Sequence, residues 1–176
     1  MFYTGKGDKG FSKFKNNKIS KDNYIIDLLG ELDELNSLIG LTKNYVKKYK
    51  KKLEKIQNDL FIIQAQISYI LYPYFKPPKI DTKKIKDLEE EINKIENKIK
   101  PTRGFIIPGK NKESGWLHYL RAVCRRVERK LISANKKYKI GQPVLSYINR
   151  LSSYFYSLAR EIVYIKNLKE DNPSYE

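Results

Sequence analysis

The chain of 176 residues contains a single cysteine and a single histidine, and this scarcity excludes several classes of protein. With Cys124 alone, no disulfide can form within the chain and no cluster of cysteine and histidine ligands can bind a metal ion. We therefore assign no metal to protein ligands. The sequence predicts a protein of a reducing compartment, which we take to be the cytoplasm.

Long hydrophobic runs are also missing. The most apolar stretch is LFIIQAQISYILYPYF, at residues 60–75, and glutamines interrupt it well before the roughly 20 apolar residues that a transmembrane helix needs. The N-terminus lacks the apolar segment of a signal peptide. No membrane partner is expected, and the composition, 40% hydrophobic and 32% charged residues, is typical of a soluble globular protein.

Acidic residues are few compared with basic ones. The chain has 20 Asp and Glu against 36 Lys and Arg, a formal net charge of +16. Such an excess is compatible with nucleic acid, an anionic membrane or a phosphorylated ligand, and charge alone does not choose among them. Seven lysines lie between residues 43 and 55, where we expect a solvated helix face.

Apolar residues recur at spacings of three and four in five segments, which predicts five amphipathic helices. The stripes cover residues 25–39, 53–74, 85–99, 117–131 and 144–165, with Asp22 as the expected N-cap of the first helix. No segment predicts a convincing strand. Since each helix has one apolar face and most connections are short, the expected fold is all-α. It is a five-helix up-and-down bundle at residues 22–167, within a single domain at 1–176.

The first residues contain a G-x-G-x-x-G pattern formed by Gly5, Gly7 and Gly10. A dinucleotide-binding turn needs a strand before these glycines and a helix directly after them, and neither is predicted here. The pattern therefore does not indicate a Rossmann fold. A flexible cationic loop that wraps a polyphosphate and a solvated N-terminal tail both fit these residues.

Charged residues border the apolar stripe of the fourth predicted helix. On a helical wheel Arg121, Arg125 and Glu128 fall within about 80° of Leu117. A charge at a helix interface is costly unless it is paired, so these residues need partners or a ligand. A buried ion-pair cluster or an oligomer contact is the alternative. The wheel places three further charges on the solvent side, namely Arg126, Arg129 and Lys130.

Two polar residues on other helices also lie away from their apolar stripes. Asp33 falls about 100° or more from the stripe of the first helix, and Asn149 lies nearly opposite the main stripe of the fifth. Asp33 is therefore a candidate partner for the charges of the fourth helix. Solvation of Asp33 and a surface or helix-contact role for Asn149 are the simpler interpretations.

Together, four segments resemble the ATP:cob(I)alamin adenosyltransferases of the propanediol-utilisation type. They are YTGKGDKGFS, GELDELNSLIG, FIIPGKNKESGWLHYLRAVCRRVERKL and YINRLSSYFYSLAR, and they leave out only the lysine-rich second and third helices. The resemblance implies five-helix subunits that assemble as a homotrimer and bind ATP between neighbours. It also implies transfer of the 5′-deoxyadenosyl group of ATP to cob(I)alamin, with release of triphosphate.

The resemblance implies a role for each matched residue. Residues 1–20 would form the ATP-binding loop, with Lys21 also reaching the phosphates. The loop residues around the triphosphate and its Mg²⁺ would be Thr4, Gly7, Asp8, Lys9, Gly10 and Ser12. ATP would also be held by Arg121, Arg125, Glu128 and Asn149, and the two arginines would act in catalysis. Asp33 would pair across the subunit interface with the partner subunit's Arg121.

Phe105 matches the aromatic residue that crowds the lower face of the corrin, although its spacing alone favours an ordinary core phenylalanine. Cobalt(I) is itself a strong nucleophile, so no protein base is required and we interpret His118 and Cys124 as structural. The family commonly has a glycine where this chain has Lys110, so the resemblance does not predict the contacts of that loop. A corrinoid reductase and an adenosylcobalamin-dependent mutase are the implied protein partners.

Two other interpretations of the residues remain. A basic helical nucleic-acid-binding protein would use the lysine run and some of the 14 tyrosines, but the chain contains no recognised nucleic-acid-binding motif. A purely structural bundle explains the apolar stripes but leaves the charges beside the fourth stripe unexplained. The resemblance therefore favours the enzyme.

Overall fold

A computed structural model describes residues 2–14, 17–99 and 104–175 of the chain. Its five α-helices are α1 (Tyr24–Tyr45), α2 (Lys50–Leu71), α3 (Thr82–Lys98), α4 (Lys112–Tyr138) and α5 (Gln142–Ile165). A short 3₁₀ helix, Lys47–Tyr49, joins α1 to α2. The five predicted helices and the all-α class are confirmed.

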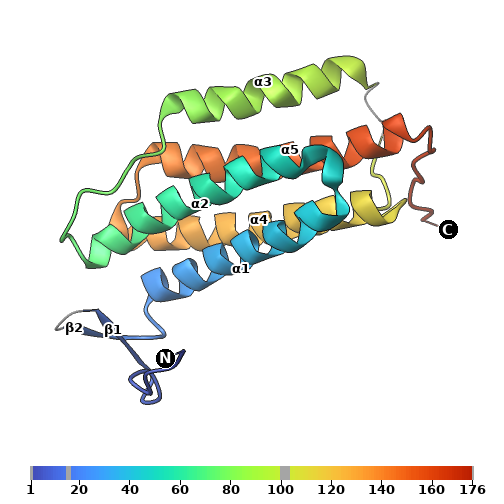
Figure 1. The fold of residues 1–176 in the computed structure, drawn as a ribbon. Coiled ribbons are helices and arrows are strands. Elements are labelled where there is room, and N and C mark those ends of the chain that lie inside the picture. Colours follow the sequence, from blue (N-terminus) through green and yellow to red (C-terminus); the bar gives the residue numbers. More distant parts are fainter. Residues whose placement is uncertain (1, 15–16, 100–103, 176) are drawn as a thin grey trace.

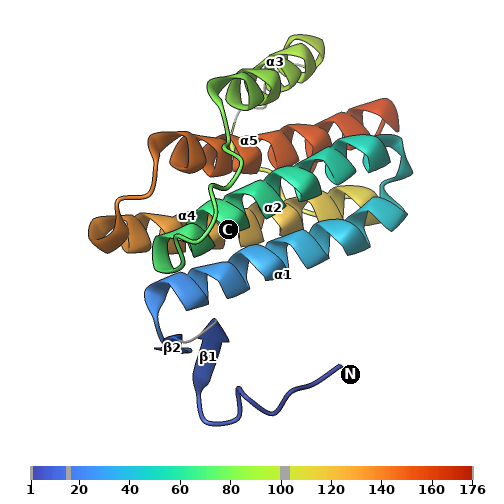
Figure 2. The ribbon, with the colours of Figure 1, turned by 60° about the vertical axis from the view of Figure 1, so that its left-hand side comes forward.

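The helices form one elongated bundle, with α3 on its outer side. α1 packs against α2 and α4, and α5 packs against α4 and α3 (Figures 1 and 2). The α1–α2 and α4–α5 connections are short, as expected. A longer connection, residues 72–81, precedes α3, and residues 104–111 lead into α4. Among the described residues, no helix is both long and apolar enough to span a membrane.

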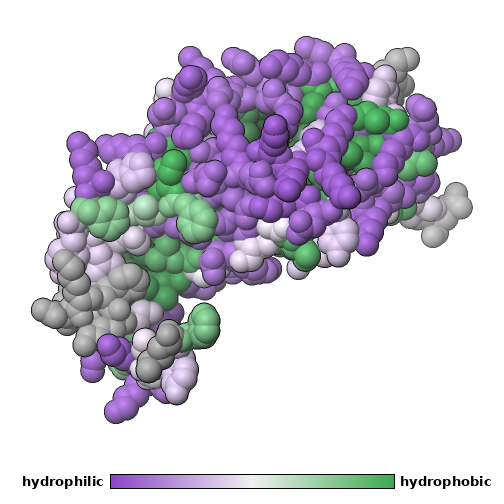
Figure 3. Space-filling model, in the orientation of Figure 1, coloured by the Kyte–Doolittle hydropathy of each residue, from purple (hydrophilic) through white to green (hydrophobic). Residues whose placement is uncertain are grey.

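The predicted apolar stripes of the helices meet in one continuous core. Leu32 of α1, Leu120 of α4 and Phe155 of α5 are fully buried in it, together with Ile63 of α2. Burial of such side chains contributes about 1.5–3 kcal/mol each to folding. The face of the molecule in Figure 3 is mostly hydrophilic, and apolar side chains show mainly at the end near the N-terminal hairpin and between α3 and α5.

Two expectations about the start of the bundle are wrong. The N-cap of α1 is Asn23, whose side-chain oxygen accepts a hydrogen bond from the Ile25 amide at 2.9 Å, and not Asp22. A short antiparallel hairpin also precedes α1, formed by β1 (Phe11–Phe14) and β2 (Asn17–Ser20). Strands of four residues are too short to give a clear alternating pattern, which is why the sequence did not predict them.

Charges on α4 join it to α1. Arg126 pairs with Glu31 at 2.7 Å and also with Glu34, and Lys130 pairs with Asp27 at 2.6 Å. The prediction that Arg126 is an ordinary solvent-facing residue is therefore wrong, because its guanidinium lies between two carboxylates of the neighbouring helix. A helical wheel treats one helix alone and cannot detect such a contact.

Candidate functional site

The N-terminal glycine loop lies outside the bundle and forms a closed turn (Figure 1). The Asp8 amide donates to the Gly5 carbonyl at 3.4 Å, and the Gly10 amide donates to the Gly7 carbonyl at 3.1 Å. Gly5 and Gly10 have φ of +64° and +77°, a left-handed conformation that favours glycine. The G-x-G-x-x-G pattern is thus a turn followed by a hairpin, which agrees with the exclusion of a Rossmann site.

The hairpin returns the chain so that Lys21 lies beside the glycine loop. The Lys21 amide donates to the Gly10 carbonyl at 2.9 Å, and its ammonium nitrogen would lie 3.1 Å from a Cβ built at Gly7. Ser12 lies in the same hairpin, opposite Ile19. The structure therefore brings Lys21 to the loop. Loop residues Thr4, Asp8 and Lys9 are exposed, so their polar atoms are open to a ligand.

The polar residues of α4 and α5 form one open face. The Asn149 amide group donates to Glu128 at 2.6 Å and accepts a hydrogen bond from Arg150 at 2.6 Å. Arg125 is exposed one turn before Glu128 on α4. Guanidinium groups bind phosphate oxygens well, and a carboxylate accepts hydrogen bonds from hydroxyl or amino groups. In one chain this face is an open surface and not an enclosed pocket.

Arg121 lies at one end of this face and contacts an aromatic residue that the sequence did not indicate as part of a site. Its guanidinium carbon is 5.5 Å from the ring centroid of Tyr156, within the range of a cation–π contact. Tyr156 follows Asn149 by seven residues, or about two helical turns. This spacing places Tyr156 on the same side of α5 as Asn149 and could have indicated it as a site residue. An aromatic residue on a helix is, however, easily assigned to the core.

His118, three residues before Arg121 on α4, also contacts Tyr156. The two rings meet edge to face with centroids 5.9 Å apart. Burial, followed by the positive charges of Arg121 and Arg160, lowers the pKa of His118. The imidazole is therefore held in its neutral form, as suits a packing residue.

Asp33 and Arg121 do not meet within the described chain. Asp33 is exposed on α1 and lines a shallow cavity of 430 Å³ between α1 and α2. Phe61 and Phe75 line the same cavity and are 60% and 54% exposed. Exposed aromatic side chains around a carboxylate are typical of a surface that packs against another protein.

Phe105 is 78% exposed, so the interpretation of it as a core phenylalanine is wrong. Its neighbour Gly104 lines a cavity of 510 Å³ with residues of α3 and α5. Tyr156 and Arg160 line that same cavity. The segment that carries Phe105 and the aromatic residue that contacts Arg121 therefore border one space.

Cys124 is buried in the core, where its thiol donates to the Ile148 carbonyl at 3.4 Å. Burial raises the pKa of this thiol, with Glu128 adding to the effect. A neutral, buried thiol is a poor nucleophile, which agrees with a structural role.

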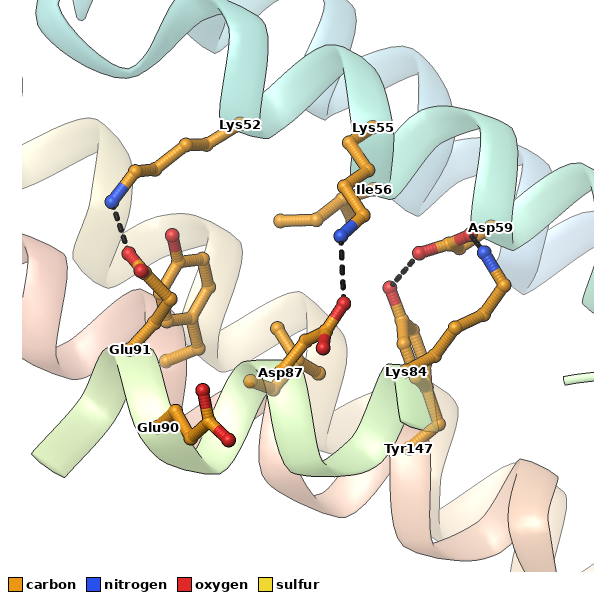
Figure 4. Close-up of a pocket in the computed structure, with 11 residues that line it drawn as sticks. Lys52, Lys55, Ile56, Asp59, Lys84, Asp87, Glu90, Glu91 and Tyr147 are labelled. Atoms are coloured by element: carbon orange, nitrogen blue, oxygen red, sulfur yellow. Dashed lines mark hydrogen bonds and ion pairs between the residues drawn. The ribbon is translucent and has the colours of Figure 1, made fainter. Parts of the chain in front are cut away.

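A third cavity, of 330 Å³ and lined by many charged residues, lies between α2, α3 and α5 (Figure 4). Most of its charges already pair with one another: Lys55 contacts Asp87 at 3.0 Å, and Lys52 contacts Glu91. The buried Asp59 accepts a hydrogen bond from Tyr147 at 2.9 Å and pairs with Lys84 at 2.5 Å. These contacts attach α3 to the bundle and indicate a structural role.

A matching arrangement lies toward the other end of α3. Glu161 of α5 accepts hydrogen bonds from Tyr49 at 2.5 Å and from Lys98 at 3.1 Å. Burial acts against ionisation of this carboxyl, but the two hydrogen bonds and nearby lysines hold its pKa below the ordinary value. Each end of α3 thus supplies a lysine to a buried carboxylate that also binds a tyrosine.

Comparison with known proteins agrees with this arrangement. The chain belongs to the cobalamin adenosyltransferase family, whose sequence profile matches residues 2–162. It is 33% identical over 180 residues to the bovine (Bos taurus) corrinoid adenosyltransferase MMAB, covering 97% of this chain and 73% of that protein. It is 34% identical over 162 residues to the corrinoid adenosyltransferase PduO of Salmonella typhimurium, covering 90% of this chain and 48% of that longer protein.

Solved structures share the fold. One is an arginine-to-lysine variant of the PduO-type adenosyltransferase of Lactobacillus reuteri complexed with ATP, with a TM-score of 0.88, 31% identity and coverage of 98% and 99% of the two chains. A phenylalanine-to-histidine variant of that enzyme, complexed with cobalamin and ATP, gives a TM-score of 0.90 at 28% identity over 99% of this chain and 97% of that one. The comparisons give no support to a nucleic-acid-binding protein.

Proposed function

We propose that this protein transfers the 5′-deoxyadenosyl group of ATP to cob(I)alamin, forming adenosylcobalamin and releasing triphosphate. The observation that carries the proposal is the position of Tyr156. Its ring contacts Arg121 of the polar face and lines the cavity that reaches Gly104, next to the exposed Phe105. A nucleotide on the polar face and a large planar ligand at Phe105 would therefore be neighbours.

The reaction needs alignment more than acid–base chemistry. Cobalt(I) of the substrate supplies an electron pair to the 5′-carbon of ATP, the cobalt–carbon bond forms, and the carbon–oxygen bond to triphosphate breaks. Both electrons of the broken bond leave with the triphosphate. Because the nucleophile comes from the substrate, the neutral His118 and the buried Cys124 are not needed as catalysts.

The cationic residues stabilise the leaving group in this proposal. Arg121 and Arg125 would bind triphosphate oxygens, and Lys21 would join them from the glycine loop with Thr4 and Lys9. Preorganised positive charge aimed at a leaving group lowers the barrier because it needs no rearrangement during the reaction. Glu128 and Asn149, already hydrogen-bonded, would hold the nucleoside part of ATP.

Magnesium would accompany the triphosphate. Among the described residues, no group of three or more His, Cys, Asp or Glu side chains gathers to form a metal site. This donor set fits an ion that takes most of its ligands from phosphate and water, with Asp8 and Ser12 as the nearby oxygen donors of the loop. The bound ion would neutralise charge on the triphosphate.

Phe105 would act on the corrin. A lower axial ligand donates electron density to cobalt and makes reduction of cobalt(II) less favourable, so an aromatic side chain that displaces this ligand helps reduction. An exposed ring is free to make that contact. We therefore assign Phe105 to the cobalamin side of the site.

A homotrimer would complete the site. Asp33 and its aromatic surroundings lie on the α1–α2 face, whereas Arg121 lies on the α4–α5 face. A head-to-tail assembly brings two different faces together, and closure of the ring gives a cyclic oligomer. Asp33 would then pair with the partner subunit's Arg121 and enclose the open nucleotide face.

The wider setting follows from the same proposal. A reductase that delivers an electron to cobalt(II) must supply the substrate, and a mutase that uses adenosylcobalamin would consume the product. The lone, buried cysteine supports a reducing compartment, for which we propose the cytoplasm.

The direct test uses the purified protein with MgATP and chemically reduced cob(I)alamin under anaerobic conditions. We expect the cob(I)alamin absorption to be replaced by that of adenosylcobalamin, with one triphosphate released for each corrin converted. Reactions without ATP, or with an ATP analogue that cannot lose triphosphate, are the controls. A wild-type protein that binds neither substrate would overturn the proposal.

A further inference from the structure

The segment that follows α5, residues 166–175, folds back against the segment that carries Phe105. We call it the return segment. The Asn172 amide group donates to the Phe105 carbonyl at 2.8 Å, and the Ile107 amide donates to the Asp171 carbonyl at 2.8 Å. The Lys110 ammonium contacts both carboxylate oxygens of Asp171, at 3.0 and 2.9 Å. Two neighbouring residues thus contact three positions in residues 105–110.

The return segment is itself attached to α5. Arg160 pairs with Glu170 at 2.8 Å, and the two side chains are only 13% and 15% exposed. A largely buried ion pair is screened less by water and salt than a surface pair. Because Glu170 directly precedes Asp171, this pair fixes the return segment next to the cavity that Tyr156 and Arg160 line.

These contacts attach the segment that carries Phe105 to residues 171 and 172. Its ring is mostly exposed, so packing of the side chain contributes little to its position. The hydrogen bond at its own carbonyl and the contacts of Ile107 and Lys110 attach the backbone instead. Lys110 is the only charged residue in residues 105–110, and Asp171 supplies its partner.

We propose that the return segment is a positioning element for the cobalamin side of the site, with Asp171 as its central residue. Asp171 holds the Phe105 segment at two points, through its carbonyl and its carboxylate. Asp171, Asn172 and Lys110 are positioning residues, because they act on the substrate only through Phe105. The catalytic consequence rests on the proposed function, whereas the attachment of the two segments does not.

Hydrogen exchange tests the attachment without any substrate. In Asp171→Asn and in Lys110→Met, we expect exchange in a peptide covering residues 104–110 to become about two- to fivefold faster, the size that one partly exposed ion pair supports. The charge-swapped double variant Lys110→Glu with Asp171→Lys should restore slow exchange. Lys130→Met is the matched control, since it removes an ion pair with Asp27 on α1, and neither residue belongs to the return segment or to residues 105–110. Unchanged exchange in both single variants would overturn the proposal.

Kinetics test the positioning role. Asp171→Asn should slow conversion that starts from cob(II)alamin by about the same two- to fivefold and lower the fraction of four-coordinate cob(II)alamin seen by electron paramagnetic resonance. The KM for ATP and the rate with preformed cob(I)alamin should change less than about twofold, and the double variant should recover the loss. Faster exchange with unchanged cob(II)alamin conversion would refute the positioning role. A wild-type protein without adenosyl transfer would instead refute the proposed function, and the exchange measurement would still decide the attachment.

Discussion

The amide group of Asn149 donates to Glu128 at 2.6 Å, and this contact orients a carboxylate of α4 from α5 on the open polar face. Asn149→Ala removes the donor and leaves Glu128 free to rotate. A hydrogen bond to a charged group contributes about 1.5–3 kcal/mol, so we expect ATP affinity to fall by about tenfold or more. Titration calorimetry with MgATP measures this. Asn93→Ala, on the exposed side of α3, is the control and should leave ATP affinity unchanged. Equal ATP affinities of the wild type and both variants would contradict the assignment of Asn149 to ATP binding.

Asp33→Ala should weaken the assembly and the activity together. If Asp33 pairs with the partner subunit's Arg121, the substitution leaves a partly buried arginine without its carboxylate, a change that is strongly destabilising at an interface. Light scattering during gel filtration, at the concentration of the activity assay, should show fewer trimers and a lower rate. Glu90→Ala, an exposed carboxylate on α3, should change neither quantity. A fully active wild-type monomer would defeat this interpretation.

Deletion of residues 1–10 should abolish ATP binding while the helical circular dichroism stays nearly unchanged. Residues 2–10 precede the hairpin, and none of them belongs to the buried core. In the intact protein, protease cleavage within the loop should slow when MgATP is added, since ligand contacts would order it. Retention of full ATP affinity in the deletion variant would show that this loop is only a solvated terminal segment.

Phe105→Ala separates reduction of cobalt from alkyl transfer. The variant should strongly impair conversion that starts from cob(II)alamin and affect much less the reaction supplied with preformed cob(I)alamin. Because the ring is 78% exposed, its loss should shift the melting temperature little, unlike a core phenylalanine, whose truncation costs about 3–5 kcal/mol. Phe155→Ala provides that core comparison. Equal losses in both assays would rule out a role at the lower axial face.

His118 predicts a pH dependence of stability. Burial lowers its pKa in the folded protein from the ordinary 6.5, so just below pH 6.5 the unfolded chain binds more protons than the folded chain. The free energy of unfolding should therefore rise with pH through that interval. Urea denaturation between about pH 5 and 7.5 measures this free energy, and its increase with pH should be smaller in His118→Gln than in the wild type. An identical pH dependence of the free energy of unfolding in the two proteins would show that His118 does not contribute to it.

The helices could be predicted because their information is local. Leu120, Cys124 and Val127 repeat at helical spacing, and the structure buries all three. The hairpin was not predictable, because strands of four residues are too short for a clear alternating pattern, and the contact of Lys21 with Gly10 that it produces is not local in sequence. The N-cap of α1 was missed by one residue, since Asp22 and Asn23 are both good capping residues and only the backbone geometry chooses between them.

Part of the candidate site could be predicted because charged residues lie beside the apolar stripe of a helix, where a charge without a partner is costly. Arg121 and Glu128 border an apolar stripe, which indicated a partner or a ligand. The contacts of Tyr156 and Arg160 could not be found this way, because an aromatic residue fits the core pattern and the partner of Arg160 lies in the polar return segment. The roles of the site residues in ATP and cobalamin binding stay predictions.

The exposure of Phe105 has a consequence for how substitutions at this position are detected. A large ring that is held in water contributes almost nothing to the free energy of folding. A library of variants selected only for solubility or protease resistance should therefore accept almost any side chain at residue 105, while it rejects most changes at Phe155. An aromatic preference at residue 105 should emerge only when cells must make adenosylcobalamin to grow.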